Sequence, residues 1–352
     1  MSRFGANGRV FFIEEAVVDG ETPSLEVIER GSGIFVCVPH IPANVQPDIY
    51  DDIAISLIDE LLGRYDLNNY VAWFYTPMML GWARDLRPLS VIYDCMDQLS
   101  AFKNAPPELI EREKELFARA DLVFTGGRSL FEAKRDEHPA VYAFPSSIDK
   151  DHFAKAMEQQ GDVAEQSAID HPRIGFVGVI DERSDLDLLG AVADILPQMN
   201  FIMVGPVVKI DESSMPRRSN IHYLGQKTYD ELPAILAGWD VAMMPFALNE
   251  STRYISPTKT PEFLAAGLPV VSTPIADVVD PYGNEGLVRI ASTPQEFAAC
   301  IEEALQDDRT LRRAKAEEFL REFSWDTTFK SMQKLILDHV EANAQHTASA
   351  GS

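Results

Sequence analysis

The stretch that decides the fold runs from Ile255 to Pro274 and reads ISPTKTPEFLAAGLPVVSTP. It predicts a loop and then a helix, because Thr260 and Pro261 suit the N-cap and the first turn of a helix. Gly267 suits the end of that helix, and the apolar residues after it predict a buried strand. A helix that leads into a buried strand is typical of α/β proteins with parallel sheets.

Short apolar runs and longer amphipathic stretches alternate on both sides of this segment. The predicted strands are residues 10–13, 33–38, 71–75, 90–93, 122–125, 141–145, 173–178, 201–205, 221–224, 241–245, 269–272 and 287–290. The predicted helices are residues 49–65, 107–120, 184–196, 228–237, 260–266, 294–305, 311–323 and 327–344. The polar segment 146–172 has no strand-like run, so we interpret it as the connection between two domains.

Two Rossmann-like domains that face each other across a cleft are therefore expected in this chain of 352 residues. We predict an N-terminal domain over 1–148, a C-terminal domain over 149–323, a crossover helix over 324–344 and a disordered tail over 345–352. Open parallel sheets bind ligands beyond the carboxyl ends of their strands. A ligand is therefore expected in the cleft between the two domains.

Charge and cysteine content exclude several classes of function. The chain has 31 Lys+Arg against 55 Asp+Glu, a net charge of −24, so the phosphate backbone of a nucleic acid would be repelled. Cys37, Cys95 and Cys300 form neither a disulfide framework nor a paired metal motif, and the histidines show no ligand spacing. No apolar run approaches the roughly 20 residues that span a bilayer, and the start lacks a signal peptide. We expect a soluble cytoplasmic protein with no metal site, and leave open a peripheral contact with the inner face of the membrane.

Polar residues at the start of the helix in the opening stretch form the sharpest candidate site. Thr258, Lys259 and Thr260 stand beside free N–H groups of a helix N-terminus, which favour an anion. Glu262 in the first turn could accept hydrogen bonds from vicinal ribose hydroxyls. A well-capped helix with a surface Lys and Glu would give the same pattern, so these residues alone do not decide between the two interpretations.

Together with its surroundings, this segment resembles a known family. The series Lys259…Glu262-Phe-Leu-Ala-Ala-Gly-Leu-Pro-Val-Val-Ser is similar to the donor-site motif of GT-B glycosyltransferases of the retaining, family-4-like kind. Residues 178–183 resemble the loop in which that family holds the donor diphosphate with a basic side chain. Ser324-Trp325-Asp326 and the last helix resemble the segment that crosses back to the N-terminal domain. The similarity is greatest to a subgroup of teichuronic acid biosynthesis glycosyltransferases, with relatives fused to UDP-galactopyranose mutase, and rests on residues 93–97, 124–130, 144–147 and 205–211.

The resemblance implies an α/β GT-B fold and a hexosyltransferase-type enzyme. It would move a sugar from a nucleotide diphosphate donor, a UDP-sugar, to a cell-surface polysaccharide or glycan acceptor, including a lipid-linked one. Retention at the anomeric carbon and independence of any metal or cofactor belong to the same expectation. The expected donor-binding residues are Gly178, Asp181, Arg183, Gly205, Tyr223, Leu224, Gly225, Asn249, Ser256, Thr258, Lys259, Thr260 and Glu262. The expected catalytic residues are Arg183, Lys259, Asp94 and Asp97.

Some of these side chains also have a plain structural explanation. Arg183 follows a strand and could take two phosphate oxygens, or form a surface ion pair with Asp185 or Asp187. Tyr223 could stack on a nucleobase or anchor the end of a strand. The two aspartates that follow the strand at 90–93 could orient or deprotonate an acceptor hydroxyl, or cap the next segment.

Two departures from the family pattern leave alternatives open. Tyr254 stands where many members have a Glu that binds sugar hydroxyls. The family fold opens with a strand ahead of the helix that Ser2-Arg3-Phe4 ends, so a central strand of the first sheet would be missing, unless an upstream start codon supplies it. The alternatives are an epimerase of UDP-sugars on the same scaffold and a catalytically weak binding component of a polysaccharide-assembly complex. The sequence does not indicate the oligomeric state.

Overall fold

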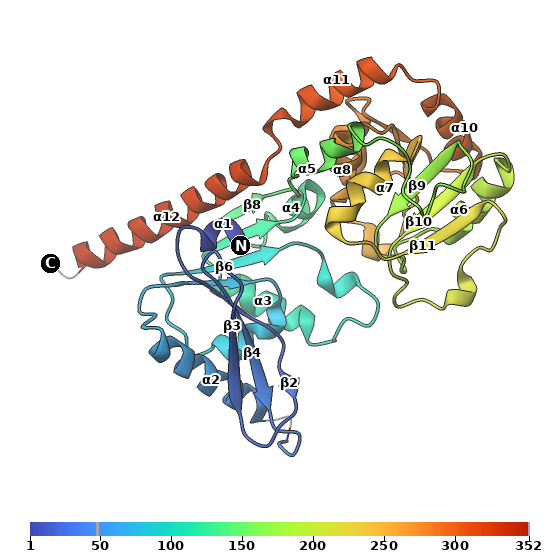
Figure 1. Cartoon of the computed structure of the whole chain (residues 1–352). Helices are drawn as coiled ribbons and strands as arrows, with labels where there is room; N and C mark the ends of the chain where they lie inside the picture. Colours follow the sequence, from blue (N-terminus) through green and yellow to red (C-terminus); the bar gives the residue numbers. More distant parts are fainter. Residues whose placement is uncertain (47–48, 351–352) are drawn as a thin grey trace.

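The computed structural model describes residues 1–46 and 49–350, and its two α/β domains are joined by a long helix that runs alongside the first domain (Figure 1). The N-terminal domain contains α1 (Ser2–Gly5), β1 (Val10–Ile13), β2 (Val17–Val18), β3 (Ser24–Glu29), β4 (Ile34–Ile41), α2 (Tyr50–Arg64), β5 (Val71–Phe74), η2 (Pro77–Ala83), β6 (Ser90–Cys95), η3 (Leu99–Ala101), α3 (Leu109–Arg119), β7 (Leu122–Thr125), α4 (Arg128–Lys134) and β8 (Val141–Ala143).

The strands of this domain form two separate sheets. One is the parallel sheet β5-β6-β7-β8, and the other has the order β1-β4-β2 with β3 antiparallel on β4. We predicted a single Rossmann-like sheet and missed β2 and β3, because both are short or partly exposed and β3 carries two glutamates. Within the described residues, β1 pairs only with β4 and β5 only with β6.

The C-terminal domain is a six-stranded parallel sheet in the order β11-β10-β9-β12-β13-β14. Its strands are β9 (Arg173–Val177), β10 (Asn200–Val204), β11 (Ile221–Gly225), β12 (Val241–Met244), β13 (Val270–Ser272) and β14 (Val288–Ile290). Its helices are α5 (Lys150–Ala154), η4 (Lys155–Met157), α6 (Leu186–Ile195), η5 (Glu212–Ser214), η6 (Tyr229–Glu231), α7 (Leu232–Ala237), η7 (Glu250–Thr252), α8 (Lys259–Ala265), α9 (Ala276–Val278), η8 (Val279–Gly283), α10 (Pro294–Ala304), α11 (Arg309–Phe319) and η9 (Leu320–Glu322).

The strand order of this second sheet indicates at which edge a ligand would bind. The order reverses between β9 and β12, and such a switch point opens a crevice at the carboxyl ends of the two strands. The residues that follow these strands are tied together, because Ser184 and Phe246 form an isolated bridge. Buried apolar clusters cover both faces of the sheet, so the edge at the carboxyl ends is where polar groups can gather.

Helix α12 (Trp325–Ala350) returns to the N-terminal domain, as we expected (Figure 1). Ile336 packs in one cluster with Ile92 and Phe124 of the first domain, and Phe329 contacts Phe4 edge-on at 4.8 Å. The expected disordered tail is wrong for residues 345–350, which continue the helix, while 351–352 lie outside the described residues. Small and polar residues gave no apolar stripe from which that extension could be predicted.

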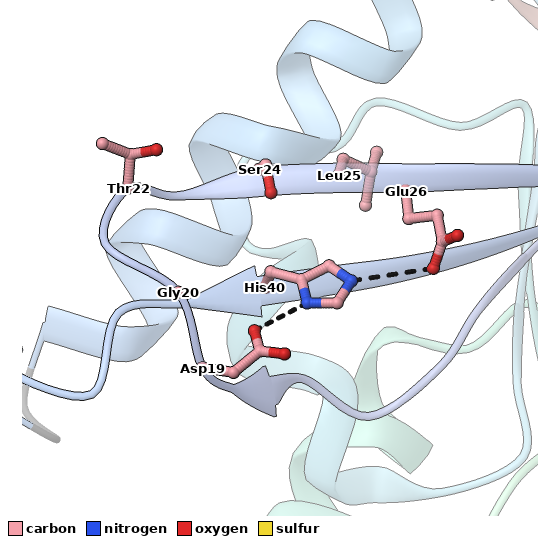
Figure 2. A pocket seen from close by; sticks show the side chains of 7 residues that line it. All are labelled: Asp19, Gly20, Thr22, Ser24, Leu25, Glu26 and His40. Atoms are coloured by element: carbon pink, nitrogen blue, oxygen red, sulfur yellow. Dashed lines mark hydrogen bonds and ion pairs between the residues drawn. The ribbon is translucent and has the colours of Figure 1, made fainter.

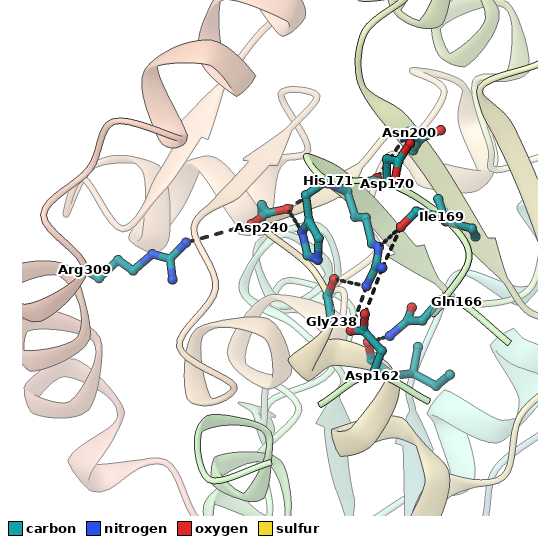
Figure 3. A network of polar contacts seen from close by, with 11 residues as sticks. Asp162, Gln166, Ile169, Asp170, His171, Asn200, Gly238, Asp240 and Arg309 are labelled. Carbon is teal, nitrogen blue, oxygen red and sulfur yellow. Dashed lines mark hydrogen bonds and ion pairs between the residues drawn. The ribbon is translucent and has the colours of Figure 1, made fainter. Parts of the chain in front are cut away.

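The connection 146–172 is bound to the second domain rather than free. The guanidinium of Arg173 is 2% exposed and donates to both carboxylate oxygens of Asp162 at 2.8 and 2.9 Å. It also donates to the backbone carbonyls of Ile169 and Gly238. Figure 3 shows Asp162 and Ile169 gathered against the second domain within this network. These contacts of the connection fix where the chain enters the sheet at β9.

Candidate functional site

Glycines stand at the carboxyl ends of three neighbouring strands, β9, β10 and β11. Gly205 has φ +144°, and a Cβ there would lie 1.8 Å from the carbonyl oxygen of Gly178. Its N–H donates to the carbonyl of Gly225 at 2.8 Å. The structure therefore brings together three of the expected donor-site residues, and their missing side chains leave backbone groups accessible at this edge.

Arg183 lies on the loop after β9 and is held by an acidic neighbour. Its guanidinium donates to the carboxylate of Asp181 at 2.7 to 3.1 Å, and the hydrogen bond with Asp181 is the main cause that raises the pKa of Arg183. The Asp181 side chain is 5% exposed, whereas that of Arg183 is 30% exposed. Asp181 thus orients the arginine, and an anionic ligand would meet Arg183 rather than Asp181. Asp185, one of the two expected ion-pair partners, instead caps α6 through the N–H of Leu188.

A second cation lies at the start of α8. The ammonium group of Lys259 contacts the Glu262 carboxylate at 2.7 Å, and both side chains are largely buried. Burial raises the pKa of Glu262, and the charges of Lys259 and His152 oppose that shift. The ring of His152 in turn stacks on Tyr229 at 4.1 Å. The sequence did not single out either aromatic side chain near Glu262.

The first turn of α8 corrects one local prediction. We expected Thr260 to be the N-cap, but the helix begins at Lys259 with Thr258 before it. Thr260 is fully buried and donates its hydroxyl to the sulfur of Met244 at 3.5 Å. Thr258 is exposed, and Ser256 lies beside Gly127 of the first domain. The Thr260 side chain therefore faces the core, while Thr258 remains accessible to a ligand.

The expected base- and sugar-contacting residues are held by local contacts. The hydroxyl of Tyr223 donates to the carbonyl of Pro216 at 3.0 Å, and the Arg217 guanidinium lies 5.2 Å from the ring centre. Leu224 packs against the core. The amide of Asn249 donates to the carbonyl of Glu182 at 3.0 Å, and its oxygen caps η7. These contacts give Tyr223 the anchoring role that we considered beside base stacking, and they tie the loop after β12 to the loop after β9.

The two candidate aspartates of the first domain lie in different surroundings. Asp94 accepts a hydrogen bond from the indole N–H of Trp73 at 3.1 Å, and burial raises its pKa from 3.8 to about 6. Burial also raises the pKa of Asp97, against the opposing charge of Arg183. Asp97 thus belongs to the same electrostatic environment as the second domain's arginine. Asp94 is in reach of the amine of Met1 instead.

The sequence analysis did not predict the contacts between the two domains. Lys103 donates its backbone N–H to Glu182 at 3.3 Å and its ammonium group to the carbonyl of Lys209 at 3.1 Å. Asp277 of the second domain accepts the first two backbone N–H groups of α4, those of Arg128 and Ser129, both at 2.9 Å. No local signal marks these residues, because each acts on a part of the chain at least 79 residues away.

Two cavities stand out among the described residues. One of about 210 Å³ lies between the domains, beside Arg128 and Asp277. The other, of about 360 Å³, lies at the tips of β3 and β4, where His40 contacts Asp19 at 2.7 Å and Glu26 at 3.7 Å (Figure 2). The hydrogen bond with Asp19 raises the pKa of His40. In the part of the chain that the structure describes, no three His, Cys, Asp or Glu side chains are arranged to hold a metal ion. The helices described there include none long and apolar enough to cross a membrane.

The chain is similar to known glycosyltransferases in part of its sequence and in its fold. Residues 171–307 match the family model of group 1 glycosyl transferases. Sucrose-phosphate synthase from Thermosynechococcus elongatus superposes with a TM-score of 0.71 at 15% identity, over 97% of this chain and 91% of that one. The chain has the GT-B fold. Trehalose-6-phosphate synthase OtsA has a TM-score of 0.66 at 15% identity, over 98% of this chain and 93% of that one.

Two further proteins that are similar to this chain have names that bear on its function. TuaH of Bacillus subtilis (strain 168), named for teichuronic acid biosynthesis as a glycosyltransferase, is 24% identical over 268 residues. The match covers 69% of this chain and 66% of that protein, slightly less than two thirds of its length. Anabaena Alr3699/HepE, solved in complex with UDP-glucose, has a TM-score of 0.60 at 15% identity, over 88% of this chain and 86% of that one.

Proposed function

We propose that this protein is a glycosyltransferase that moves a hexose from a UDP-sugar to a cell-surface polysaccharide or glycan, with retention and without a bound metal. The observation that carries this proposal is the presence of two oriented cations in the segments that follow β9 and β12: Arg183, held by Asp181, and Lys259, held by Glu262. The UDP and UDP-glucose complexes of Anabaena Alr3699/HepE support the choice of donor. The name of TuaH supports an acceptor in cell-envelope polysaccharide synthesis.

In the proposed reaction, the protein must stabilise the diphosphate as it leaves the sugar. Negative charge grows on the leaving phosphate as its bond to the anomeric carbon breaks, and fixed cations stabilise that charge most where water is excluded. Arg183 and Lys259 would supply the two positive charges, and Glu262 would accept the ribose hydroxyls. A front-face route, in which the leaving phosphate takes the proton of the acceptor hydroxyl, would require no nucleophilic carboxylate.

The first domain would supply the acceptor side of the cleft. Asp97 shares the electrostatic environment of Arg183, so it is the aspartate better placed to orient an acceptor hydroxyl beside the donor. Asp94, with a pKa near 6, would be ionised at neutral pH and suited to accept a proton. Both roles require the two domains to stay in contact. The hydrogen bonds of Lys103 and Asp277 provide such contacts between them.

A lipid-linked acceptor would bring the chain to the cytoplasmic face of the membrane. We propose peripheral docking there, because the donor would be made in the cytoplasm and the acceptor held in the bilayer. Flotation with liposomes of anionic and neutral lipids tests this proposal. Protein that stays at the bottom of the gradient with both compositions would contradict it.

Release of nucleotide from a panel of UDP-, GDP- and ADP-sugars, with and without EDTA, tests the proposed activity. We expect UDP-sugars alone to react, at a rate that EDTA leaves unchanged. The products formed without acceptor and those formed with bacterial envelope extract are then identified by mass spectrometry. An epimerised sugar would support an epimerase instead, and no reaction with any donor would support a binding component.

A further inference from the structure

A loop of the first domain covers the arginine of the second. The ring of Phe102, directly after η3, lies 5.7 Å from the Arg183 guanidinium carbon and 5.6 Å from the Lys209 ammonium group. Cations over an aromatic face at such distances are attracted by the ring. Phe102 is half-buried although the residues after it, Lys103 and Asn104, are exposed.

The second domain offers this ring a rigid frame. Lys209 adopts φ +61°, the left-handed region that non-glycine residues rarely occupy, and its carbonyl accepts the Lys103 ammonium group at 3.1 Å. The loop around Lys209 is tied to the loop after β9, because the N–H of Val208 donates to the carbonyl of Ile180. Glu182 accepts the backbone N–H of Lys103 from the other side. The contacts of Lys103 with Lys209 and with Glu182 therefore hold the Phe102 ring in place beside Arg183.

We propose that Phe102 is a positioning residue that keeps water away from Arg183 and from the donor diphosphate bound there. The proposal rests on the proposed function, because it assumes that Arg183 holds the diphosphate. Neither the motif of α8 nor the glycine edge involves the first domain. Phe102 would therefore couple donor protection to closure of the two domains.

The reaction to be suppressed is hydrolysis of the donor. In that step a water oxygen forms a bond to the anomeric carbon and the bond to the diphosphate breaks. The products are the free sugar and the nucleotide diphosphate, and the proton of water passes to the leaving phosphate or to solvent. Removing the ring would admit water to the Arg183 side of the cleft, so hydrolysis should rise while donor binding through Arg183 and Lys259 persists.

The test measures UDP release without acceptor, using the UDP-sugar that the wild-type chain hydrolyses fastest. We expect Phe102→Ala to raise this rate about fivefold, the change that corresponds to a cation–aromatic contact at a partly exposed site. Phe102→Tyr keeps the aromatic cover and should restore the wild-type rate. Phe11→Ala is the matched control, because it removes a half-buried ring of the same domain that contacts Arg9 at 5.9 Å.

The outcomes separate this inference from the proposed function. An increase with Phe102→Ala but not with Phe11→Ala, at unchanged affinity for UDP, supports the inference. An unchanged rate in an active enzyme, or equal loss of rate and UDP affinity in Phe102→Ala and Phe102→Tyr, overturns it and leaves the proposed function standing. A wild-type chain that neither binds UDP nor hydrolyses any nucleotide sugar contradicts the proposed function, and this inference with it.

Discussion

Replacing Asp94 by Asn should stabilise the chain at neutral pH. The pKa of Asp94 rises from 3.8 to about 6 on folding, so the folded state disfavours its charged form by about 3 kcal/mol at full ionisation. Below pH 3.8 the carboxyl is neutral in both states, and the folded state carries no penalty from it. The penalty on folding grows as the pH rises above 3.8 and is complete once the pH has passed through 6. Asn cannot ionise, and its oxygen can still accept the N–H of Trp73.

The size of the effect makes it measurable. With about 2.1 cal/mol/K of unfolding entropy per residue, about 3 kcal/mol corresponds to a rise of about 4 °C in Tm for 352 residues that unfold as one unit. We expect that rise for Asp94→Asn at pH 7.5 and much less at pH 4. If Asp94 is the base, kcat should fall about a hundredfold or more in the same variant.

Urea unfolding at the two pH values provides the free energies. Glu115→Gln, which changes an exposed carboxylate on α3, controls for the loss of one negative charge from an acidic chain. An Asp94→Asn variant no more stable than wild type at pH 7.5 would refute the reasoning. So would a gain in stability that is equally large at pH 4.

Three further changes test the contacts around the cleft and below it. Asp277→Ala leaves two backbone N–H groups of α4 without their acceptor, so stability should fall by about 1–2 kcal/mol and the radius of gyration from X-ray scattering should grow; an unchanged radius would argue against an interdomain link. Lys134→Met strands the buried carboxylate of Glu113 and should lower the free energy of unfolding by about 3–5 kcal/mol in urea, with part recovered by adding Glu113→Gln; no recovery would mean that the lost packing of Lys134 dominates. Gly205→Ala forces a methyl group against the carbonyl of Gly178 and should abolish the UDP-induced rise in Tm, whereas retention of that rise would show that this position tolerates a side chain.

The alternation of elements could be predicted from the sequence because it rests on local patterning. Each predicted strand and helix overlaps an observed one, and Gly267 ends α8 with φ +75°, as a glycine at that place should. The exposed strands β2 and β3 were missed because no strong apolar alternation marks them. The start of α8 moved to Lys259 because Thr260 packs into the core, a preference that depends on Met244 from a distant strand.

The candidate site was predictable in its residue types and less so in its contacts. Arg183 and Lys259 lie at the expected loops, but their partners depend on side-chain geometry that spacing does not determine. Asp181, which we expected to contact the donor, is also the partner that orients Arg183. The bridges of Phe102 and Asp277 join residues at least 81 positions apart, so only the folded chain reveals them.

The central claim is that the crevice of the second domain binds a UDP-sugar through Arg183 and Lys259 without a metal. Thermal melting with UDP, GDP, ADP and CMP, each with and without EDTA, tests it most directly. UDP at 100 times its Kd should stabilise the fold by about 2.7 kcal/mol, a rise of about 4 °C in Tm. The account predicts this rise for UDP alone, unchanged by EDTA and lost in Arg183→Ala and Lys259→Ala. No shift with any nucleotide, or a shift that EDTA abolishes, would contradict it.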